Sequence, residues 1–280
     1  MKKINFTKMV ASGNDFVLIE SSHKSQVTSY KSLAKKICDR KYGVGADGLL
    51  IFGKKSVNKV SMRIFNADGT EAEMCGNGAR CIALYSVQRI AYSVQRAYRV
   101  QRMNIHTKAG IVAAEVKANT VKINLPDPKD LRKDISVKIG ERNLRMDFLN
   151  TGVPHAVVFV QGLGNMDVFN LGRNIRNHKF FKPAGTNANF VEVLGDDEIR
   201  IRTYERGVED ETLACGTGTT ASAIISALRS SGWKDGNYSV KAYTRGGEVL
   251  KVCFNYNKGK LAQVWLEGKA QIVYKGEYYV

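Results

Sequence analysis

The stretch MCGNGARC, residues 74–81, decides how this sequence is interpreted. In it, Cys75 is followed at once by a Gly-x-Gly turn and then by residues 79–87, which have a helical pattern. Glycines before a helix let the backbone turn tightly and leave the first amide groups pointing outward. Those amides and the helix dipole attract an anion and favour thiolate over thiol in a neighbouring cysteine. The stretch therefore predicts a cysteine beside an anion-binding helix start.

The same device recurs far down the chain in ACGTGT, residues 214–219, before a second helical run at 219–228. The preceding segments are also similar, with IFNADG (64–69) before Cys75 and TYERG (203–207) before Cys215. A free cysteine is often a small buried hydrophobe and Gly-x-Gly is often a simple turn, so one copy alone is ambiguous. Two copies favour two similar halves that each bring one cysteine and one helix start to a shared site.

Length and composition indicate a soluble globular protein. The 280 residues are 44% hydrophobic and 25% charged, and they suffice for one large domain or two ordinary ones. No apolar run approaches the roughly 20 residues that a helix needs to span a bilayer. The N-terminus has no apolar region or cleavage site of a signal peptide. We therefore expect a cytoplasmic location and no membrane partner.

The cysteines and the charge narrow the function classes. No C-x-x-C pair or His/Cys spacing of a zinc site is present, so we expect no metal and no disulfide framework. The formal net charge is +17, but lysines and arginines are spread along the chain without a dense basic block. A generally basic surface that attracts anionic metabolites is therefore favoured over nucleic-acid binding. The cysteines are Cys38, Cys75, Cys81, Cys215 and Cys253.

Alternation of apolar residues predicts strands and helices in alternation. Before residue 126 we expect a helix at 30–39 and strands at 3–10, 16–20, 49–52, 60–65, 103–107, 111–116 and 120–125. After the break at residues 126–128 we expect strands at 142–150, 156–161, 190–194, 198–204, 238–244, 248–254, 261–266 and 270–274. Residues 43–48 match G-x-G-x-x-G, but they follow a helix and open a strand, so a helix stop and turn is the better interpretation.

Three near-copies of Tyr-Ser-Val-Gln-Arg follow the first cysteine helix, at 85–89, 92–96 and 98–102. They are too short to be solenoid repeats. We interpret them as a local duplication that extends the helix end or the loop after it, and that forms a solvated, basic, tyrosine-rich surface.

The motifs FNADGTEAEMCGNGARC (65–81) and YERGVEDETLACGTGT (204–219), with SGNDF (12–16), resemble those of the diaminopimelate epimerase family. They fall in the expected order from Asn14 to Thr217. Proline racemase-type relatives usually have His after the first Cys-Gly, where this chain has Asn77, and they lack the Tyr-Glu-Arg-Gly element.

The resemblance implies an α/β (α+β) fold of two pseudo-symmetric domains. Each would be a curled mixed sheet around a central helix, with the active site in the cleft between the domains. Residues 1–118 and 269–280 would form the half with Cys75, and residues 119–268 the half with Cys215.

The resemblance also implies the reaction, a cofactor-independent interconversion of LL- and meso-diaminopimelate in lysine and peptidoglycan biosynthesis. Such an isomerase uses neither pyridoxal phosphate nor a metal. Cys75 and Cys215 would be the two acid/base groups at the α-carbon. His155 matches the residue that partners Cys75, and Glu205 matches the one that partners Cys215.

Substrate binding is implied in the same way. The α-carboxylate would accept hydrogen bonds from amides near two pairs of residues, and the distal amino-acid end would contact Arg206 and Glu205 with three asparagines. Many family members have Asn where this chain has Val153 and Gln where it has Gly48, so one or two distal hydrogen bonds would be absent here. A homodimer is compatible with the resemblance. The amide pairs are Gly76, Asn77 and Gly216, Thr217, and the asparagines are Asn14, Asn66 and Asn187.

Two alternatives remain open at this point. A proline or hydroxyproline racemase on the same two-cysteine scaffold predicts a small closed pocket with no use for Arg206. A basic nucleic-acid-binding protein with merely buried cysteines predicts a salt-dependent interaction with DNA or RNA and no amino-acid turnover.

Overall fold

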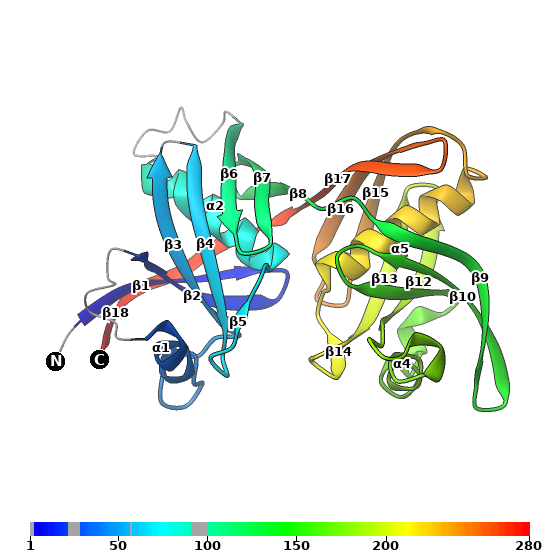
Figure 1. Cartoon of the computed structure of the whole chain (residues 1–280), viewed down its shortest axis with the longest axis horizontal. Coiled ribbons are helices and arrows are strands. Elements are labelled where there is room, and N and C mark those ends of the chain that lie inside the picture. The colour runs from blue at the N-terminus through cyan, green and yellow to red at the C-terminus, as the bar shows by residue number, and fades with distance from the viewer. Residues whose placement is uncertain (1–2, 22–28, 57, 91–99) are drawn as a thin grey trace. The chain divides into compact units, whose positions relative to one another are not determined.

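The computed structural model describes residues 3–21, 29–56, 58–90 and 100–280, and its chain divides into two compact units. Unit 1 comprises Met1–Ile123 and Gly268–Val280, and unit 2 comprises Asn124–Glu267 (Figure 1). The sequence predicts the boundary after residue 118, but the structure places it after residue 123. Residue 118 lies in the turn between β7 (Gly110–Lys117) and β8 (Thr120–Asn124), which pair antiparallel. Because strand pairing holds this hairpin together, residues 119–123 stay with unit 1.

Unit 1 contains two parallel crossover connections, as the sequence alternation indicates. Helix α1 connects the parallel strands β2 and β3, and helix α2 connects the parallel strands β4 and β6. The neighbouring strands pair antiparallel through short turns. Besides β7, β8 and the last strand, the elements are β1 (Lys3–Ala11), β2 (Asn14–Glu20), α1 (Tyr30–Ile37), β3 (Gly48–Ser56), β4 (Lys59–Asn66), β5 (Glu71–Ala72), α2 (Gly76–Ile90) and β6 (Gln101–Thr107).

Unit 2 repeats this order with a second pair of crossovers. Strands β11 and β12 are parallel, and helix α4 lies in the connection between them. Strands β13 and β15 are also parallel, and helix α5 lies in their connection. The elements are β9 (Lys129–Ile139), β10 (Arg142–Asn150), β11 (Pro154–Phe159), η2 (Leu163–Asn165), α4 (Val168–Arg176), η3 (Lys179–Phe181), β12 (Asn187–Gly195), β13 (Glu198–Glu205), β14 (Asp210–Thr212), α5 (Gly216–Ser230), β15 (Gly236–Thr244), β16 (Val249–Asn257) and β17 (Lys260–Lys269). The series β1–β8 with α2 thus corresponds to β10–β17 with α5.

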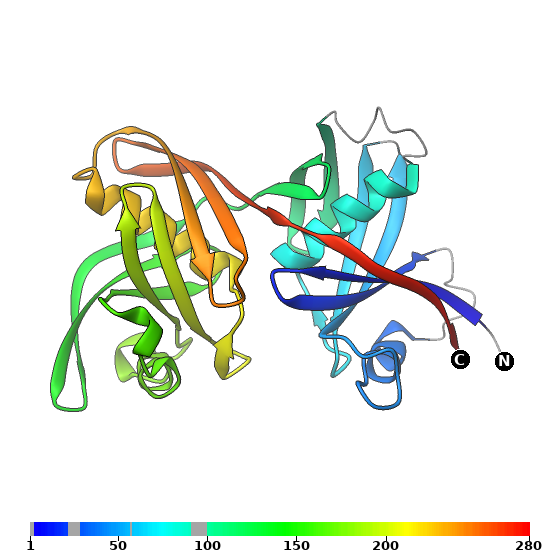
Figure 2. The same cartoon turned by 180° about the vertical axis from the view of Figure 1, so that it is seen from behind.

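The terminal strands extend the correspondence. Strand β9 follows β8 in the chain but pairs antiparallel with β10, and β18 (Gln271–Tyr279) follows β17 but pairs antiparallel with β1. Figure 2 shows β18 in red along the blue β1. In each unit, the first strand of the repeated series therefore pairs with the strand that follows the last strand of that series in the other unit. The expected mixed α/β fold with two similar halves is confirmed at the level of each unit.

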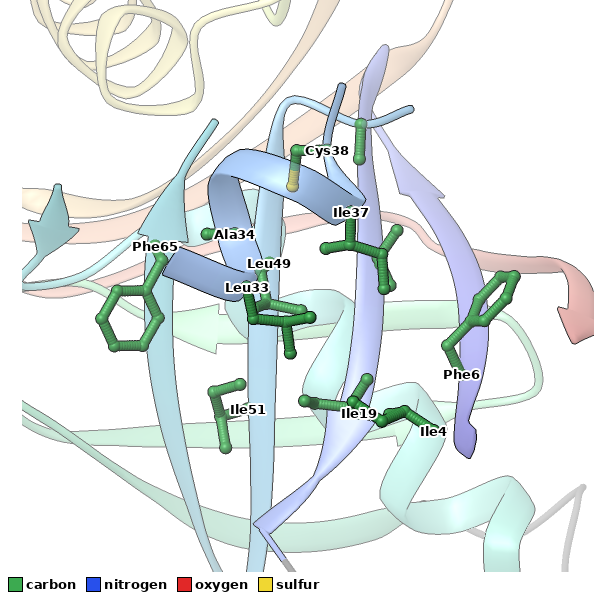
Figure 3. Close-up of a cluster of buried hydrophobic side chains, with 12 residues drawn as sticks. Ile4, Phe6, Ile19, Leu33, Ala34, Ile37, Cys38, Leu49, Ile51 and Phe65 are labelled. Atoms are coloured by element: carbon green, nitrogen blue, oxygen red, sulfur yellow. The ribbon is translucent and has the colours of Figure 1, made fainter. Parts of the chain in front are cut away.

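The core of unit 1 has a helix packed on one face of its sheet. In α1, Leu33, Ala34 and Ile37 lie on one side at helical spacing, and all three are buried. They pack against Leu49 of β3 and its neighbours in the sheet (Figure 3). Helix α4 has the same place in unit 2, where its buried residues join those of β11, β12 and β13. Both cores bury the apolar face that each crossover helix presents.

Helices α2 and α5 are the central helices of their units. Helix α5 is buried from Gly218 to Leu228, on all sides rather than along one stripe, and it packs against β10, β11, β12, β13, β15 and β16. Helix α2 packs likewise against β1, β3, β4, β6, β7 and β18. A helix whose side chains are apolar or small on all sides is typically buried within the fold. The sheet of each unit therefore curls around a central helix, as the resemblance implied.

Strand β9 and helix α4 are the longest of the elements that were not expected from the sequence. Strand β9 is mostly exposed, and only its second half alternates apolar residues, with Ile135, Val137 and Ile139 packed on the core of unit 2. Helix α4 carries Gly172 in its middle, and glycine usually weakens a helix. That glycine is required by packing, because a Cβ there would overlap the side chain of Tyr204 on β13. Close approach of α4 to the sheet thus overrides local propensity.

The tandem segment is described only in part. Its first copy, residues 85–89, belongs to α2, and its last two residues begin β6. The second copy and the proposed loop extension lie outside the described residues. Among the helices in the described part of the chain, none combines the length and the apolar character needed to cross a membrane.

Candidate active site

The two cysteine motifs occupy equivalent places in the fold. Cys75 directly precedes α2, and Cys215 is the N-cap residue of α5, each after the strand pair that leads into the crossover. The Gly78 amide donates to Cys75 Sγ at 3.4 Å, and Cys215 Sγ lies 3.5 Å from Thr217 Oγ1. Helix starts of this kind supply free amides and a positive dipole end. Both sulfur atoms are therefore placed where a negative charge is stabilised.

Strand register reveals which residues of the two units correspond. In unit 1 the register aligns Phe16, Gly48 and Asn66 across β2, β3 and β4. In unit 2 the equivalent row begins with His155 and Asn187 on β11 and β12. Glu205 continues it on β13, one residue beyond the pairing of Ala188 with Tyr204. The acid/base side chains of this row therefore lie in unit 2 alone.

His155 is fully buried at this row and is held by an amide. Asn189 Nδ2 faces His155 Nδ1 at 3.2 Å and donates to the Ala156 carbonyl at 2.9 Å. Asn189 Oδ1 accepts from Thr203 Oγ1 at 3.0 Å. His155 Nε2 has no hydrogen-bond partner among the described residues. Burial and then the positive charge of Arg206 lower the pKa of His155 to about 3, although the Asn189 contact opposes them, so the ring is neutral.

Gly218 brings the start of α5 against this cluster. A Cβ at Gly218 would overlap Asn189 Oδ1, and it would lie 3.3 Å from both Cys215 Sγ and His155 Cε1. The sulfur and the imidazole thus approach one point at the first turn of the helix. Only glycine permits this approach, because any side chain would displace the bonded amide of Asn189.

Glu205 lies beside Cys215, and burial raises the pKa of each. Burial is the main cause for the Glu205 carboxyl, although hydrogen bonds with Thr212 and Cys215 oppose it. The thiol pKa of Cys215 is raised by burial and then by the Glu205 charge, while Thr217 and the Gly218 amide lower it. Each group therefore favours its protonated form, and a proton removed from one is readily accepted by the other.

Arg206 follows Glu205 and is partly exposed. Its backbone amide donates to Asn187 Oδ1 at 2.8 Å, and its Nη1 donates to the Ala184 carbonyl at 2.9 Å. Asn187 Nδ2 donates in turn to the Pro154 carbonyl at 3.0 Å. Asn187 thus ties the end of β13 to the start of β11. This contact positions Glu205 and Arg206, a role that the sequence did not indicate for an asparagine.

In unit 1 a polar chain fixes the residues near Cys75. Asn77 Nδ2 donates to Asn14 Oδ1 at 2.6 Å, and Asn14 Nδ2 donates to Asp47 Oδ2 at 3.0 Å. Arg80 Nη2 donates to Asn77 Oδ1 at 2.6 Å and also to Ser12 Oγ. Arg80 is fully buried. Sequence reasoning missed Arg80, although an arginine one turn into a central helix is itself a sign of a buried polar partner.

Asn66, by contrast, is exposed in the turn before the first motif. Its Nδ2 donates to Thr70 Oγ1 at 2.9 Å, and the Gly69 amide donates to the Asn66 carbonyl at 2.9 Å. The structure gives it a turn role, and its substrate contact stays a prediction. Within the described residues no three His, Cys, Asp or Glu side chains are grouped so as to hold a metal ion.

Val153 and Gly48, where the chain differs from many family members, lie in different local structures. The Val153 carbonyl accepts from the Thr151 amide at 3.2 Å in the turn before β11. Gly48 begins β3, where a Cβ would come 2.9 Å from the Phe65 carbonyl oxygen. Strand β3 thus approaches β4 too closely for a side chain at this position without a shift of backbone.

Comparison with known proteins bears on this arrangement. A family model described as diaminopimelate epimerase matches residues 6–129 and 148–273. The chain belongs to the diaminopimelate epimerase family. The diaminopimelate epimerase of Aquifex aeolicus is 41% identical over 284 residues, 98% of this chain and 97% of that protein. The one from Caldanaerobacter subterraneus is 37% identical over 291 residues, 98% and 99% of the two chains.

Solved structures agree on the fold of this epimerase family member. A hydroxyproline epimerase from Agrobacterium vitis matches with a TM-score of 0.72 at 14% identity, over 99% of this chain and 91% of that one. Identity at this level supports the fold alone. The predicted resemblance to the diaminopimelate epimerase family is confirmed by the sequence matches, and membership makes the protein an isomerase.

Proposed function

We propose that this protein interconverts LL- and meso-2,6-diaminopimelate without pyridoxal phosphate or metal. The thiolate of one cysteine removes the α-proton from one face, and the thiol of a second cysteine returns a proton to the other face. The observation that carries the proposal is the repetition of one device in the two units of a diaminopimelate epimerase family chain. Cys75 and Cys215 each precede a central helix in equivalent topological places. Inversion of one carbon needs such a pair.

The reaction requires groups on both faces of the α-carbon. One thiolate removes the proton from one face, and the thiol of the other cysteine returns a proton to the opposite face. The cysteine that was thiolate ends as thiol, and the other ends as thiolate, so the reverse reaction exchanges their roles. We therefore assign Cys75 and Cys215 as the two acid/base groups.

The negative charge that develops beside the carboxylate needs fixed donors. The amides at Gly76, Asn77, Gly216 and Thr217 lie at the starts of the two central helices. A carboxylate at such a start accepts hydrogen bonds from groups that are oriented before substrate binds. We assign these amides to the α-carboxylate of the substrate.

Each thiol also needs a partner that accepts or offers a proton. Glu205 adjoins Cys215, and both prefer to be protonated, so an ionised Glu205 can take the thiol proton when substrate displaces water. His155 is proposed as the partner of Cys75. The proposed catalytic set is thus Cys75, Cys215, His155 and Glu205.

The distal end of diaminopimelate carries a second carboxylate and ammonium. Arg206 is partly exposed and can clamp a carboxylate through two parallel hydrogen bonds, and Glu205 can accept from the ammonium. Asn14, Asn66 and Asn187 are the proposed neutral partners. A second carboxylate is the feature that separates this substrate from proline.

The proposal places the reaction in lysine and peptidoglycan biosynthesis in the cytoplasm. It includes a small-molecule substrate, neither nucleic acid nor membrane as a partner, and a homodimer as the assembly.

Isotope exchange tests the proposal. LL-diaminopimelate is incubated with the protein in heavy water, and deuterium at the α-carbon is followed by mass spectrometry beside the appearance of the meso isomer. We expect both signals to rise together, and no deuterium to enter proline. Exchange into proline but not diaminopimelate would support the racemase alternative. Absence of exchange into either amino acid would refute the two-thiol proposal.

A further inference from the structure

The geometry around His155 points to a role for Asn189 that its neighbours in sequence do not suggest. We infer that Asn189 is a positioning residue that fixes His155 as the tautomer with its proton on Nε2, so that His155 offers an N–H donor to the reacting centre instead of a basic nitrogen. The inference rests on the proposed participation of His155 in catalysis.

The Asn189 amide is held in one orientation by its two hydrogen-bond partners. One end of this amide lies 2.9 Å from the Ala156 carbonyl oxygen, which can only accept a hydrogen bond. That end must therefore be the NH₂ group. Thr203 Oγ1 donates to the opposite end at 3.0 Å, as an oxygen there requires. Both contacts agree, and Asn189 is fully buried, so the amide has one orientation.

The orientation of the Asn189 amide determines which nitrogen of the His155 imidazole carries the proton. The Asn189 NH₂ group has two protons, and while one goes to Ala156 the other is directed at His155 Nδ1, 3.2 Å away. Nδ1 must then accept, and it carries no proton. A neutral ring with an unprotonated Nδ1 carries its proton on Nε2. A doubly protonated ring would oppose two N–H groups in a buried place, which is costly.

The surroundings of His155 Nε2 indicate how its proton is used. Nε2 is buried and has no hydrogen-bond partner within the part of the chain that the structure describes. A buried donor without a partner costs about 1–3 kcal/mol, so a site that retains one has a use for it when substrate is bound. His155 Cε1, the atom between the two nitrogens, approaches the first turn of α5 beside Cys215. The ring thus stands at the proposed reacting centre.

The charged and titratable groups around the ring favour the same state. Arg206, at the end of β13, opposes a positive imidazole. Cys215, at the start of α5, is bonded to Glu205, and the neighbouring strands β10 and β12 present Leu149 and Asn187 opposite His155. A neutral Nε2–H therefore stabilises a nearby thiolate or the developing negative charge on substrate. Because Nε2 already carries the ring proton, His155 serves as the thiol partner by offering a hydrogen bond rather than by accepting a proton.

Nitrogen NMR tests the tautomer without any need for turnover. The protein is labelled with ¹⁵N-histidine, and the His155 signals are assigned by their loss in His155→Gln. We expect a protonated Nε2, an unprotonated Nδ1, and no titration near the ordinary histidine pKa of about 6.5. A protonated Nδ1, or titration of His155 near its ordinary value, would overturn the inference.

Two variants separate positioning from simple packing. Asn189→Asp keeps the shape but leaves no donor for Nδ1, so a proton should move to Nδ1 and kcat should fall about 100-fold or more. Thr203→Val is the matched control, because it removes one buried hydrogen bond of the same cluster but leaves the Ala156 contact that orients the amide. Its NMR signature and the shape of its pH–kcat profile should match those of the wild type.

The outcomes are distinguishable from failure of the proposed function. If the wild type shows the Nε2–H tautomer but no deuterium exchange, the function is wrong and the geometry stands. If exchange occurs but Asn189→Asp retains the wild-type tautomer and pH profile, the inference is wrong and the function stands. The wild-type spectrum decides the tautomer even if Asn189→Asp does not fold.

Discussion

Asn66 and Glu205 end equivalent strands of the two units, but their surroundings differ. Asn66 is exposed and bonds to Thr70 within its turn, whereas Glu205 is largely enclosed beside Cys215. The same holds for Phe16 and His155, which share a register position. Similar backbones thus carry different chemistry, with the partner groups concentrated in unit 2.

At the residue scale, both thiols are expected to be required. Cys75→Ala and Cys215→Ala should each reduce epimerisation at least about 100-fold, because inversion needs an acid/base group on both faces. Circular dichroism should show an intact fold. The matched control is Cys253→Ala, whose thiol contacts only the Ser239 hydroxyl on β15 among its described hydrogen bonds and should be dispensable. Activity above about a tenth of wild type in either catalytic variant would exclude the two-base mechanism.

Arg206 tests the distal end of the substrate. Arg206→Met should raise KM and lower kcat together, by about 100- to 1000-fold in kcat/KM, because remote binding energy positions the reacting carbon. Arg206→Lys should rescue little, since an ammonium cannot form the planar two-bond pair. Arg200→Met on the same strand, where Arg200 pairs with Glu192, is the control with normal kinetics. A change within about threefold for Arg206→Met would refute the assignment.

Glu205 predicts a pH dependence of stability. Its folded-state pKa is raised by burial, so the folded state binds its proton more tightly than the unfolded state. The free energy of unfolding should therefore fall as pH rises above the ordinary value of 4.5 and through the raised pKa. Glu205→Gln lacks this loss, so the variant should gain stability over wild type with increasing pH. Urea unfolding between pH 4 and 8 measures it, and a pH-independent difference would contradict the expectation.

At the scale of elements, the two central helices begin alike but are held differently. The first turn of α2 adjoins side chains that can yield, since a Cβ at Gly78 would lie 3.0 Å from Leu50 Cδ2. The first turn of α5 adjoins Asn189, an amide fixed by its hydrogen bonds. The close approach of α5 to β12 is therefore less tolerant than that of α2 to β3.

Alanine at the equivalent glycines should reveal this difference. Gly218→Ala forces its Cβ into Asn189 Oδ1, so we expect about 1–3 kcal/mol of destabilisation and loss of the His155 contact. Gly78→Ala should cost less, because a leucine methyl can move and alanine favours helix by about 1 kcal/mol. Thermal unfolding of both variants beside wild type measures the contrast. Equal effects would show that the Asn189 contact does not limit α5.

At the scale of the whole molecule, the chain consists of two units with the same order of elements, and its last strand returns to the first unit. Strand β9 completes the unit that follows it, and β18 completes the unit that contains the N-terminal strand β1. Each unit contributes one thiol, so the proposed chemistry depends on both units and on the oxidation state of two cysteines.

Oxidation should therefore inactivate the enzyme reversibly. A cysteine in disulfide or sulfenic form has no thiolate to act as base. Protein dialysed against a chelator and free of pyridoxal absorbance should be fully active with a reductant, and mild oxidant should abolish epimerisation until dithiothreitol is added. Peptide mapping would identify the oxidised residues. Undiminished activity after oxidation of Cys75 and Cys215, or dependence of activity on added metal, would contradict the mechanism.

Much of this protein follows from the sequence by itself. The paired motifs, the helix starts at Cys75 and Cys215, the alternating strands and the family resemblance all depend on residues adjacent in the chain. Capping glycines, apolar periodicity and turn residues act locally, so a reader of the sequence recovers them. The cytoplasmic assignment and the substrate contacts of Asn14 and Asn66 stay predictions.

Tertiary structure alone decided the rest. The place of strand β9 comes from its pairing with β10, and that of helix α4 comes from the fit of Gly172 against Tyr204. Arg80 and Asn189 were not recognised as functional candidates, because Ser12 and His155, which they contact, lie far away along the chain. Hydrogen bonds between distant segments depend on strand register, which no short stretch encodes. For that reason the sequence could name His155, and only the folded sheet could orient its protons.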